Sequence, residues 1–165
     1  PTQFIASLRE MNQGFDFRGS KLCSPTSFCI GATVDLGRGM DQEVALAVRK
    51  VEAGAEFFMT QPIFDVAEAD RFRESYRSKS GMELSVPVFY GLQIMEKDGV
   101  IFSSVPEGVR EELEQGRSGV EIVLELYGRF REHGLHNVYL MPPIRRGGAR
   151  NYEAAQHVLA ASDSQ

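Results

Sequence analysis

The chain has 165 residues, of which 42% are hydrophobic and 25% are charged, so it can build the core of one ordinary domain. Its net charge of -5 argues against nucleic acid as a partner, because proteins that bind nucleic acid carry a basic face. No apolar run approaches the roughly 20 residues that cross a bilayer, so we expect a cytoplasmic protein with no membrane contact. The three histidines and two cysteines follow no zinc pattern, and we predict reduced thiols and no metal site.

Helix-like and strand-like segments alternate along the chain. In chain order, apolar spacing predicts a helix over 4–11, a strand over 27–34, a helix over 41–52, a strand over 57–60, a helix over 66–78, a strand over 86–92, helices over 106–115 and 120–132, a strand over 137–141 and a helix over 151–161. We expect Asp41 to cap the second helix and Gly54 to end it. Strands separated by helices indicate a parallel sheet, because parallel neighbours need a long crossover.

Two architectures fit this alternation: part of a (β/α)8 barrel, or an open doubly wound sheet. A whole barrel needs about 250 residues, so four strand–helix units make about half of one. The strands are nearly continuous in apolar character, which is typical of strands covered on both faces. No linker or low-complexity stretch interrupts the chain, and we predict one domain over residues 1–165.

Polar residues follow the second strand, where a parallel α/β fold places its ligands. They are Thr60, Gln61 and Asp65. A carboxamide donates and accepts hydrogen bonds at once, which suits a heterocycle with mixed edges such as a flavin, a pterin or a nicotinamide. The alternative is that Gln61 satisfies loop backbone and that Asp65 caps the following helix.

Two groups of basic residues are further candidates. Arg145, Arg146 and Arg150 surround two glycines before the last helix, a setting that favours an anion but also fits an exposed basic turn. Arg49 and Lys50 lie together within a helix, which by itself indicates a solvated face. No Ser-His-Asp arrangement, Cys-His arrangement or P-loop occurs, and we identify no catalytic residue in the chain.

The segment from Lys50 to Asp65, KVEAGAEFFMTQPIFD, carries the most specific pattern. It resembles the signature of the methylenetetrahydrofolate reductases, a K-x-x-A-G-A stretch that leads into a T-Q-P-x-[FY]-D strand end. Residues 11–32 resemble the segment before the fifth barrel strand, and residues 140–155 resemble the eighth strand and the last helix. The resemblance covers most of the chain, in the style of the reductase domain that bacteria fuse to homocysteine S-methyltransferase.

This resemblance implies half of a TIM (β/α)8 barrel, strands five to eight with their helices. It also implies a cytoplasmic flavoprotein oxidoreductase of one-carbon metabolism and methionine biosynthesis. The family reduces 5,10-methylenetetrahydrofolate to 5-methyltetrahydrofolate, with NADH or NADPH as the electron source and FAD as the cofactor.

Site residues carry over from the family by position. Gln61 matches a glutamine that contacts folate and nicotinamide. One arginine among Arg145, Arg146 and Arg150 is expected to bind substrate, and Arg150 is the one that we assign. The residues expected to bind FAD are Glu43, Arg49, Lys50, Met59 and Thr60.

Two acidic residues of the family have no counterpart here. The catalytic glutamate lies on the first barrel strand in an E-F-x-P-P context, and an acid that tunes the flavin follows the fourth strand in a G-D context. Neither motif occurs in this sequence. Residues 93–98, QIMEKD, also differ from the Pro-Leu and Asn-rich stretch expected after strand seven.

These departures lead to three hypotheses. The first is a reductase-type half, inactive alone, that forms a homo-oligomer or joins a partner chain supplying the N-terminal half of the barrel. The second is a non-catalytic half-barrel module that binds folate, flavin or a protein partner. The third is an unrelated α/β phosphate binder built on the arginine loop.

Overall fold

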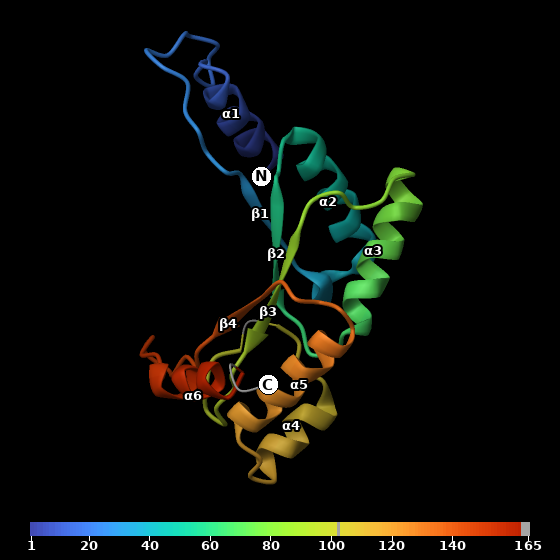
Figure 1. Ribbon diagram of the computed structural model, residues 1–165, viewed down its shortest axis with the longest axis vertical. Helices are drawn as coiled ribbons and strands as arrows, with labels where there is room; N and C mark the ends of the chain where they lie inside the picture. The colour runs from blue at the N-terminus through green and yellow to red at the C-terminus, as the bar shows by residue number, and fades with distance from the viewer. Residues whose placement is uncertain (102, 163–165) are drawn as a thin grey trace. The chain divides into compact units, whose positions relative to one another are not determined.

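The computed structural model describes residues 1–101 and 103–162 and shows an α/β fold (Figure 1). Its strands form a four-stranded parallel sheet in the order β1-β2-β3-β4, with helices between them along the chain. This arrangement confirms the predicted fold class, parallel (β/α) units that correspond to about half of a barrel. The elements are α1 (Thr2–Asn12), β1 (Gly31–Val34), η1 (Leu36–Arg38), α2 (Met40–Ala53), β2 (Phe57–Pro62), α3 (Ala67–Ser80), β3 (Val88–Gln93), α4 (Glu107–Glu114), α5 (Gly119–Glu132), β4 (Val138–Met141) and α6 (Tyr152–Ser162).

The described residues divide into two compact units. The first comprises Pro1–Thr60 and Asp70–Phe89, and the second comprises Gln61–Ala69 and the chain from Tyr90 onward. The prediction of one domain over residues 1–165 stays a prediction. None of the helices in the described chain has the length and apolar character needed to span a bilayer.

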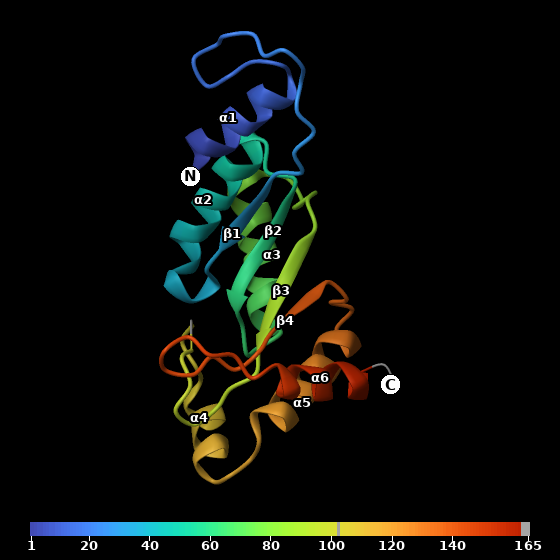
Figure 2. The same ribbon diagram turned by 90° about the vertical axis from the view of Figure 1, so that its left-hand side faces the viewer.

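In the first unit, β1 and β2 pair in parallel, from Gly31 opposite Phe57 to Val34 opposite Thr60. Helix α3 covers β2 through an edge-to-face contact between the rings of Phe58 and Phe72, whose centroids lie 6.5 Å apart. Helix α2 packs against α1 (Figure 2). The apolar side of α3 thus buries one face of β2.

Strand β1 begins at Gly31, so the prediction of a strand from residue 27 is wrong for its first four positions. The Asn12 carboxamide donates to the Phe28 carbonyl and accepts from the Phe28 N–H, each at 2.8 Å. The Glu56 carboxylate accepts the Ile30 N–H at 2.6 Å. Side chains therefore take the backbone groups that a strand would pair, and apolar periodicity does not register such competition.

One face of β1 is uncovered in the described residues. Val34 is buried, whereas Gly31 and Thr33 are exposed. The expectation that each strand is covered on both faces is therefore wrong for β1.

Helix α2 begins at Met40, and its N-cap is Gly39, which provides no side-chain hydrogen bond. The prediction that Asp41 caps this helix is therefore wrong. Asp41 lies in the first turn, where its negative charge still favours the helix dipole. Gly54 ends the helix as predicted, in a left-handed conformation with φ 118° and ψ 21°.

In the second unit, β3 and β4 pair in parallel, from Tyr90 opposite Val138 to Gln93 opposite Met141. Helix α5 covers β3 through Phe130, whose ring meets that of Tyr90 at 5.9 Å between centroids. Helix α6 packs against α5.

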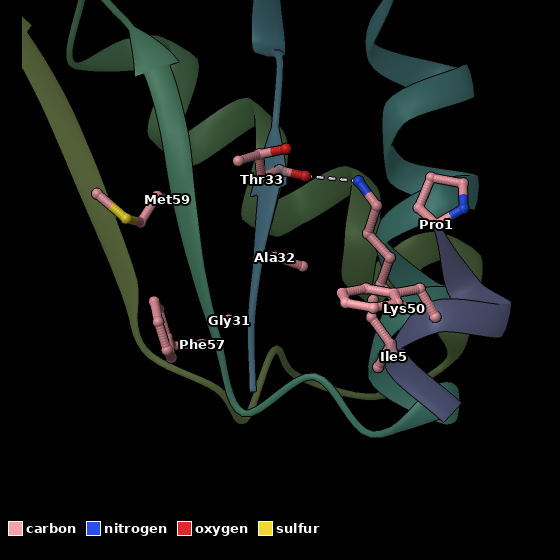
Figure 3. A pocket seen from close by; sticks show the side chains of 9 residues that line it. Pro1, Ile5, Gly31, Ala32, Thr33, Lys50, Phe57 and Met59 are labelled. Atoms are coloured by element: carbon pink, nitrogen blue, oxygen red, sulfur yellow. Dashed lines mark hydrogen bonds between the residues drawn. The ribbon is translucent and has the colours of Figure 1, made fainter. Parts of the chain in front are cut away.

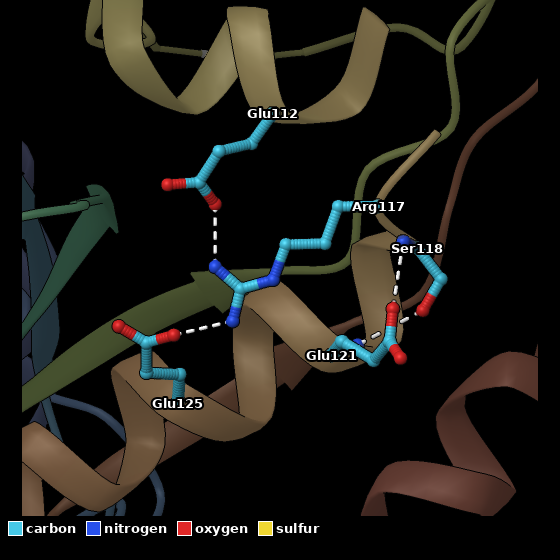
Figure 4. A network of polar contacts seen from close by, with 5 residues as sticks. All are labelled: Glu112, Arg117, Ser118, Glu121 and Glu125. Atoms are coloured by element: carbon cyan, nitrogen blue, oxygen red, sulfur yellow. Dashed lines mark hydrogen bonds and ion pairs between the residues drawn. The ribbon is translucent and has the colours of Figure 1, made fainter. Parts of the chain in front are cut away.

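A polar network joins α4 to α5 (Figure 4). The Arg117 guanidinium pairs with Glu112 at 2.6 Å and with Glu125. Ser118 and Glu121 form a capping box in which each side chain accepts the other residue's backbone N–H, at 3.1 and 3.0 Å. The network fixes the point at which α5 starts.

Candidate ligand-binding site

Arg49 and Lys50, the adjacent basic pair of α2, have opposite environments. Arg49 is exposed, whereas Lys50 is only 4% exposed. One residue of an α-helix turns the side chain by about 100°, so neighbours along the chain point to different sides. The expectation of a solvated face is correct for Arg49 and wrong for Lys50.

The Lys50 ammonium donates a hydrogen bond to the Thr33 carbonyl at 2.5 Å (Figure 3). The Ile30 carbonyl accepts the Glu56 N–H at 2.7 Å, so Ile30 directs its backbone groups toward β2. Backbone groups alternate in direction along a strand, which turns the Thr33 carbonyl toward the unpaired edge of β1. Lys50 therefore satisfies an edge carbonyl that has no strand neighbour in the described chain.

Burial lowers the pKa of Lys50, because removal from water disfavours the ammonium, and the negative charge of Glu43 partly opposes this shift. Glu43 also accepts the Asp35 N–H at 3.3 Å. The structure thus brings Glu43 and Lys50 into one electrostatic environment at the end of β1.

An open groove of about 490 Å³ lies beside Lys50 in the first unit (Figure 3). Its walls are mainly apolar, and a side chain at Gly31 would collide with the Phe57 ring, 2.2 Å from the position of its Cβ. The groove combines one cation with apolar and aromatic surface. Its lining residues are Pro1, Phe4, Ile5, Gly31, Ala32, Thr33, Lys50, Phe57 and Met59.

Met59 and Thr60 are both expected to bind FAD, but only Met59 lines this groove. Thr60 is 1% exposed, and the alternation of a strand places it on the other face of β2 from Met59. The structure therefore groups Glu43, Lys50 and Met59 and separates Thr60 from them.

Gln61 lies within β2, since the strand continues to Pro62, so the expectation that it belongs to a loop is wrong. Its side chain is half-buried, and its carboxamide has no hydrogen-bond partner among residues 1–101 and 103–162. Asp65 lies two residues before α3, and its carboxylate accepts the Ala67 N–H at 3.1 Å. Gln61 thus keeps both donor and acceptor for a ligand.

Four residues of the second unit share one face of the strands, which we call the Gln61 face: Gln61, Gly91, Gln93 and Tyr139. The Phe57 and Phe89 rings meet edge to face at 5.9 Å, which identifies matching faces of β2 and β3. The two-residue period of a strand then adds Gln61 to the Phe57 side and Gly91 and Gln93 to the Phe89 side. The Tyr139 side chain lies over Gly91, so β4 contributes to the same face.

The amide nitrogen of Gln93, itself 1% exposed, donates to the Val100 carbonyl at 2.7 Å. This bond holds the loop after β3 against the strand end. Along β2 and β3 the residues of this face change from phenylalanine at the start to glutamine at the carboxyl end. The polar end is where a parallel fold binds its ligands.

The loop after β4 is anchored by Glu96. Arg145 donates to its two carboxylate oxygens at 2.9 and 3.2 Å, and Asn151 donates to it at 2.8 Å. Hydrogen bonds from Arg145 and then Asn151 lower the pKa of Glu96. Arg145 is therefore engaged in structure, whereas Arg146 and Arg150 are exposed and make no side-chain hydrogen bond within the described residues.

Sequence reasoning missed Tyr139, Gln93 and the Glu96 anchor. Tyr139 had a usable signal, because it alternates with Val138 and Leu140 and so carries a hydroxyl to the opposite face of an apolar strand. Glu96 and Arg145 are 49 positions apart, and no local pattern relates them.

Comparisons with known proteins bear on the fold. No family model and no curated protein matches the sequence. Among solved structures, the chain is similar to an uncharacterized protein from Clostridium thermocellum that binds two copies of 5-methyl-5,6,7,8-tetrahydrofolic acid, with a TM-score of 0.56 and 19% identity. The match covers 78% of this chain and 51% of that one, so this chain spans about half the length of the protein it matches. At this identity the likeness shows the fold alone.

Proposed function

We propose that the chain is part of a methylenetetrahydrofolate reductase-type flavoprotein domain and that it binds a reduced folate at the Gln61 face. One observation carries the proposal: the open carboxamide of Gln61 stands at the carboxyl end of β2, within the motif that resembles this family. A fold similar to that of a protein that binds 5-methyltetrahydrofolic acid supports the same ligand.

The proposed reaction is the reduction of 5,10-methylenetetrahydrofolate to 5-methyltetrahydrofolate by NADH or NADPH through FAD. FAD, when bound, supplies the two-electron relay between the pyridine nucleotide and the folate. In this proposal the Gln61 carboxamide binds the edge of the folate ring and Arg150 pairs with a carboxylate of the folate tail. No residue of this chain is assigned as the proton donor.

The groove of the first unit has donors and surfaces that fit a flavin dinucleotide. Lys50 supplies a buried cation, and Phe57 and Met59 supply surface for an aromatic ring. Glu43 adds an acceptor near Lys50. Glu43, Lys50 and Met59 would hold FAD. The expected roles of Arg49, which is exposed and outside the groove lining, and of Thr60 stay predictions.

A second candidate is a half-barrel module that binds folate without turnover. The Gln61 face favours it, because its four residues offer hydrogen bonds to a folate and include no carboxyl group. Both candidates predict folate binding at Gln61, and they differ in FAD uptake and NADH oxidation.

Binding measurements test both candidates. Calorimetry with 5-methyltetrahydrofolate is expected to show binding that Gln61→Ala weakens about tenfold, because a ring edge loses its hydrogen bonds. Gln156→Ala, at an exposed position of α6, is the matched control and should bind as the unchanged chain does. FAD uptake, followed by its absorbance, should be lost in Lys50→Met.

Each outcome separates the hypotheses. Folate binding without FAD uptake would support the non-catalytic module over the reductase. An unchanged chain that binds no folate would overturn both. The phosphate binder would be favoured if the chain binds inorganic phosphate and loses that binding when Arg146 and Arg150 are substituted. Substituting Gln61 or Lys50 should then have no effect.

A further inference from the structure

The Tyr139 ring reaches from β4 across a glycine on β3. A Cβ at Gly91 would lie 2.8 Å from the Tyr139 hydroxyl oxygen and 3.0 Å from the ring carbon that bears it. The same Cβ would lie 3.2 Å from the backbone nitrogen of Pro62, the residue after Gln61. Gly91 thus provides the space through which the hydroxyl extends toward the strand that carries Gln61.

The hydroxyl is a neutral group in this setting. Burial raises the pKa of Tyr139, because removal from water disfavours the phenolate. Gln61 is neutral as well, so this part of the Gln61 face offers donors and acceptors without charge. The exposed cations Arg146 and Arg150 lie instead in the loop after β4.

This separation matches a ligand with a neutral heterocyclic edge and an anionic tail. Carboxylates are bound by guanidinium groups, whereas ring edges with alternating N–H and C=O groups are bound by amides and hydroxyls. We infer that Tyr139 is a further specificity-determining residue of the folate site, whose hydroxyl, placed by Gly91, binds the heterocyclic ring edge together with Gln61. The inference rests on the proposed function.

Two substitutions test this role. Tyr139→Phe removes only the hydroxyl and should weaken binding of 5-methyltetrahydrofolate about three- to tenfold, as the loss of one hydrogen bond does. Gly91→Ala pushes the hydroxyl away and should have a similar effect. The double variant Gly91→Ala/Tyr139→Phe should bind no more weakly than either single variant, because both changes remove the same contact.

A second ligand distinguishes recognition of the ring from general damage. p-Aminobenzoylglutamate has the tail without the heterocycle, so it should bind more weakly than 5-methyltetrahydrofolate. Its affinity should be the same for Tyr139→Phe as for the unchanged chain. Tyr152→Phe, at a tyrosine that is 63% exposed, is the matched control and should leave both affinities unchanged. Thermal unfolding of each variant identifies any that fails to fold.

The outcomes separate this inference from the proposed function. If the unchanged chain binds 5-methyltetrahydrofolate and Gln61→Ala weakens binding while Tyr139→Phe does not, the role of Tyr139 is overturned and the proposed function stands. Equal losses for both ligands in Tyr139→Phe would also overturn it. An unchanged chain without folate binding would overturn the proposed function and this inference with it.

Discussion

Single glycines decide how closely elements approach in the second unit. Gly119, the first residue of α5, packs against the backbone of Met95, and a Cβ there would lie 1.9 Å from the Met95 carbonyl oxygen. Gly128, in the same helix, has no atom within 4 Å of the corresponding position. The two glycines share a helix but have different roles, one in close packing and the other at an open position.

Gly119→Ala should lower the free energy of unfolding by about 3 kcal/mol, because backbone atoms cannot yield to the new methyl group as a side chain can. Gly128→Ala should raise it by about 0.5–1 kcal/mol, since alanine is favoured over glycine in a helix interior. Urea unfolding of both variants gives the comparison. Equal effects at the two positions would contradict the close approach to Met95.

Some residues of the site could be identified from the sequence, and others could not. Gln61 was predictable because a polar residue ends an apolar strand. That its carboxamide has no partner among the described residues depends on the tertiary structure, which a local pattern does not report. The burial of Lys50 beside an exposed Arg49 depends on the phase of α2 relative to β1. That phase is a tertiary property that a charge pair in the sequence does not reveal.

At the scale of the elements, α5 has a start defined by side chains. The capping box of Ser118 and Glu121 satisfies backbone N–H groups that the first turn leaves without partners. Hydrogen bonds from the Ser118 backbone and hydroxyl lower the pKa of Glu121. The cap therefore depends on the charge state of a carboxylate.

Ser118→Ala should lower the free energy of unfolding by about 1 kcal/mol at neutral pH. Because the folded pKa of Glu121 is lowered, its contribution is present above the ordinary glutamate pKa of about 4.3 and is lost as pH falls through the lower folded value. The stability difference between the two proteins should therefore shrink below about pH 4.3. Chemical unfolding at several pH values measures it, and a constant difference would contradict a role for the Glu121 charge.

Element order was predictable from sequence, and element ends were less so. Every predicted helix and strand is present, because apolar spacing and breakers such as Gly54 report local periodicity. The start of β1 was wrong, because Asn12 and Glu56 hold the preceding backbone from distant positions. The cap of α2 was wrong, because a glycine takes that place without any side-chain hydrogen bond.

At the scale of the whole molecule, a chain with an uncovered strand face is expected to associate. Gly31 and Thr33 of β1 are exposed. Uncovered strands tend to pair with other strands. We therefore predict a homo-oligomer, or a complex with a partner chain that supplies further strands.

Sedimentation velocity over a range of concentrations should show a species of twice the chain mass when no partner is present. Thr33→Lys places a charge on the exposed face of β1 and should shift the protein toward the monomer. Gln3→Lys, at an exposed position of α1, adds the same charge elsewhere and should not. A protein that stays monomeric at every concentration and binds none of the candidate partners would contradict the prediction.

The hydrogen bond from Lys50 to the Thr33 carbonyl has a consequence for solubility. An exposed strand edge is a template for uncontrolled stacking of chains, and lysine is one of the residues that natural proteins use to block it. Here the lysine occupies the edge acceptor itself, so any added strand must first displace a charged group from its partner. Substituting Lys50 would then remove the cation of the groove and would also make the protein more prone to aggregate.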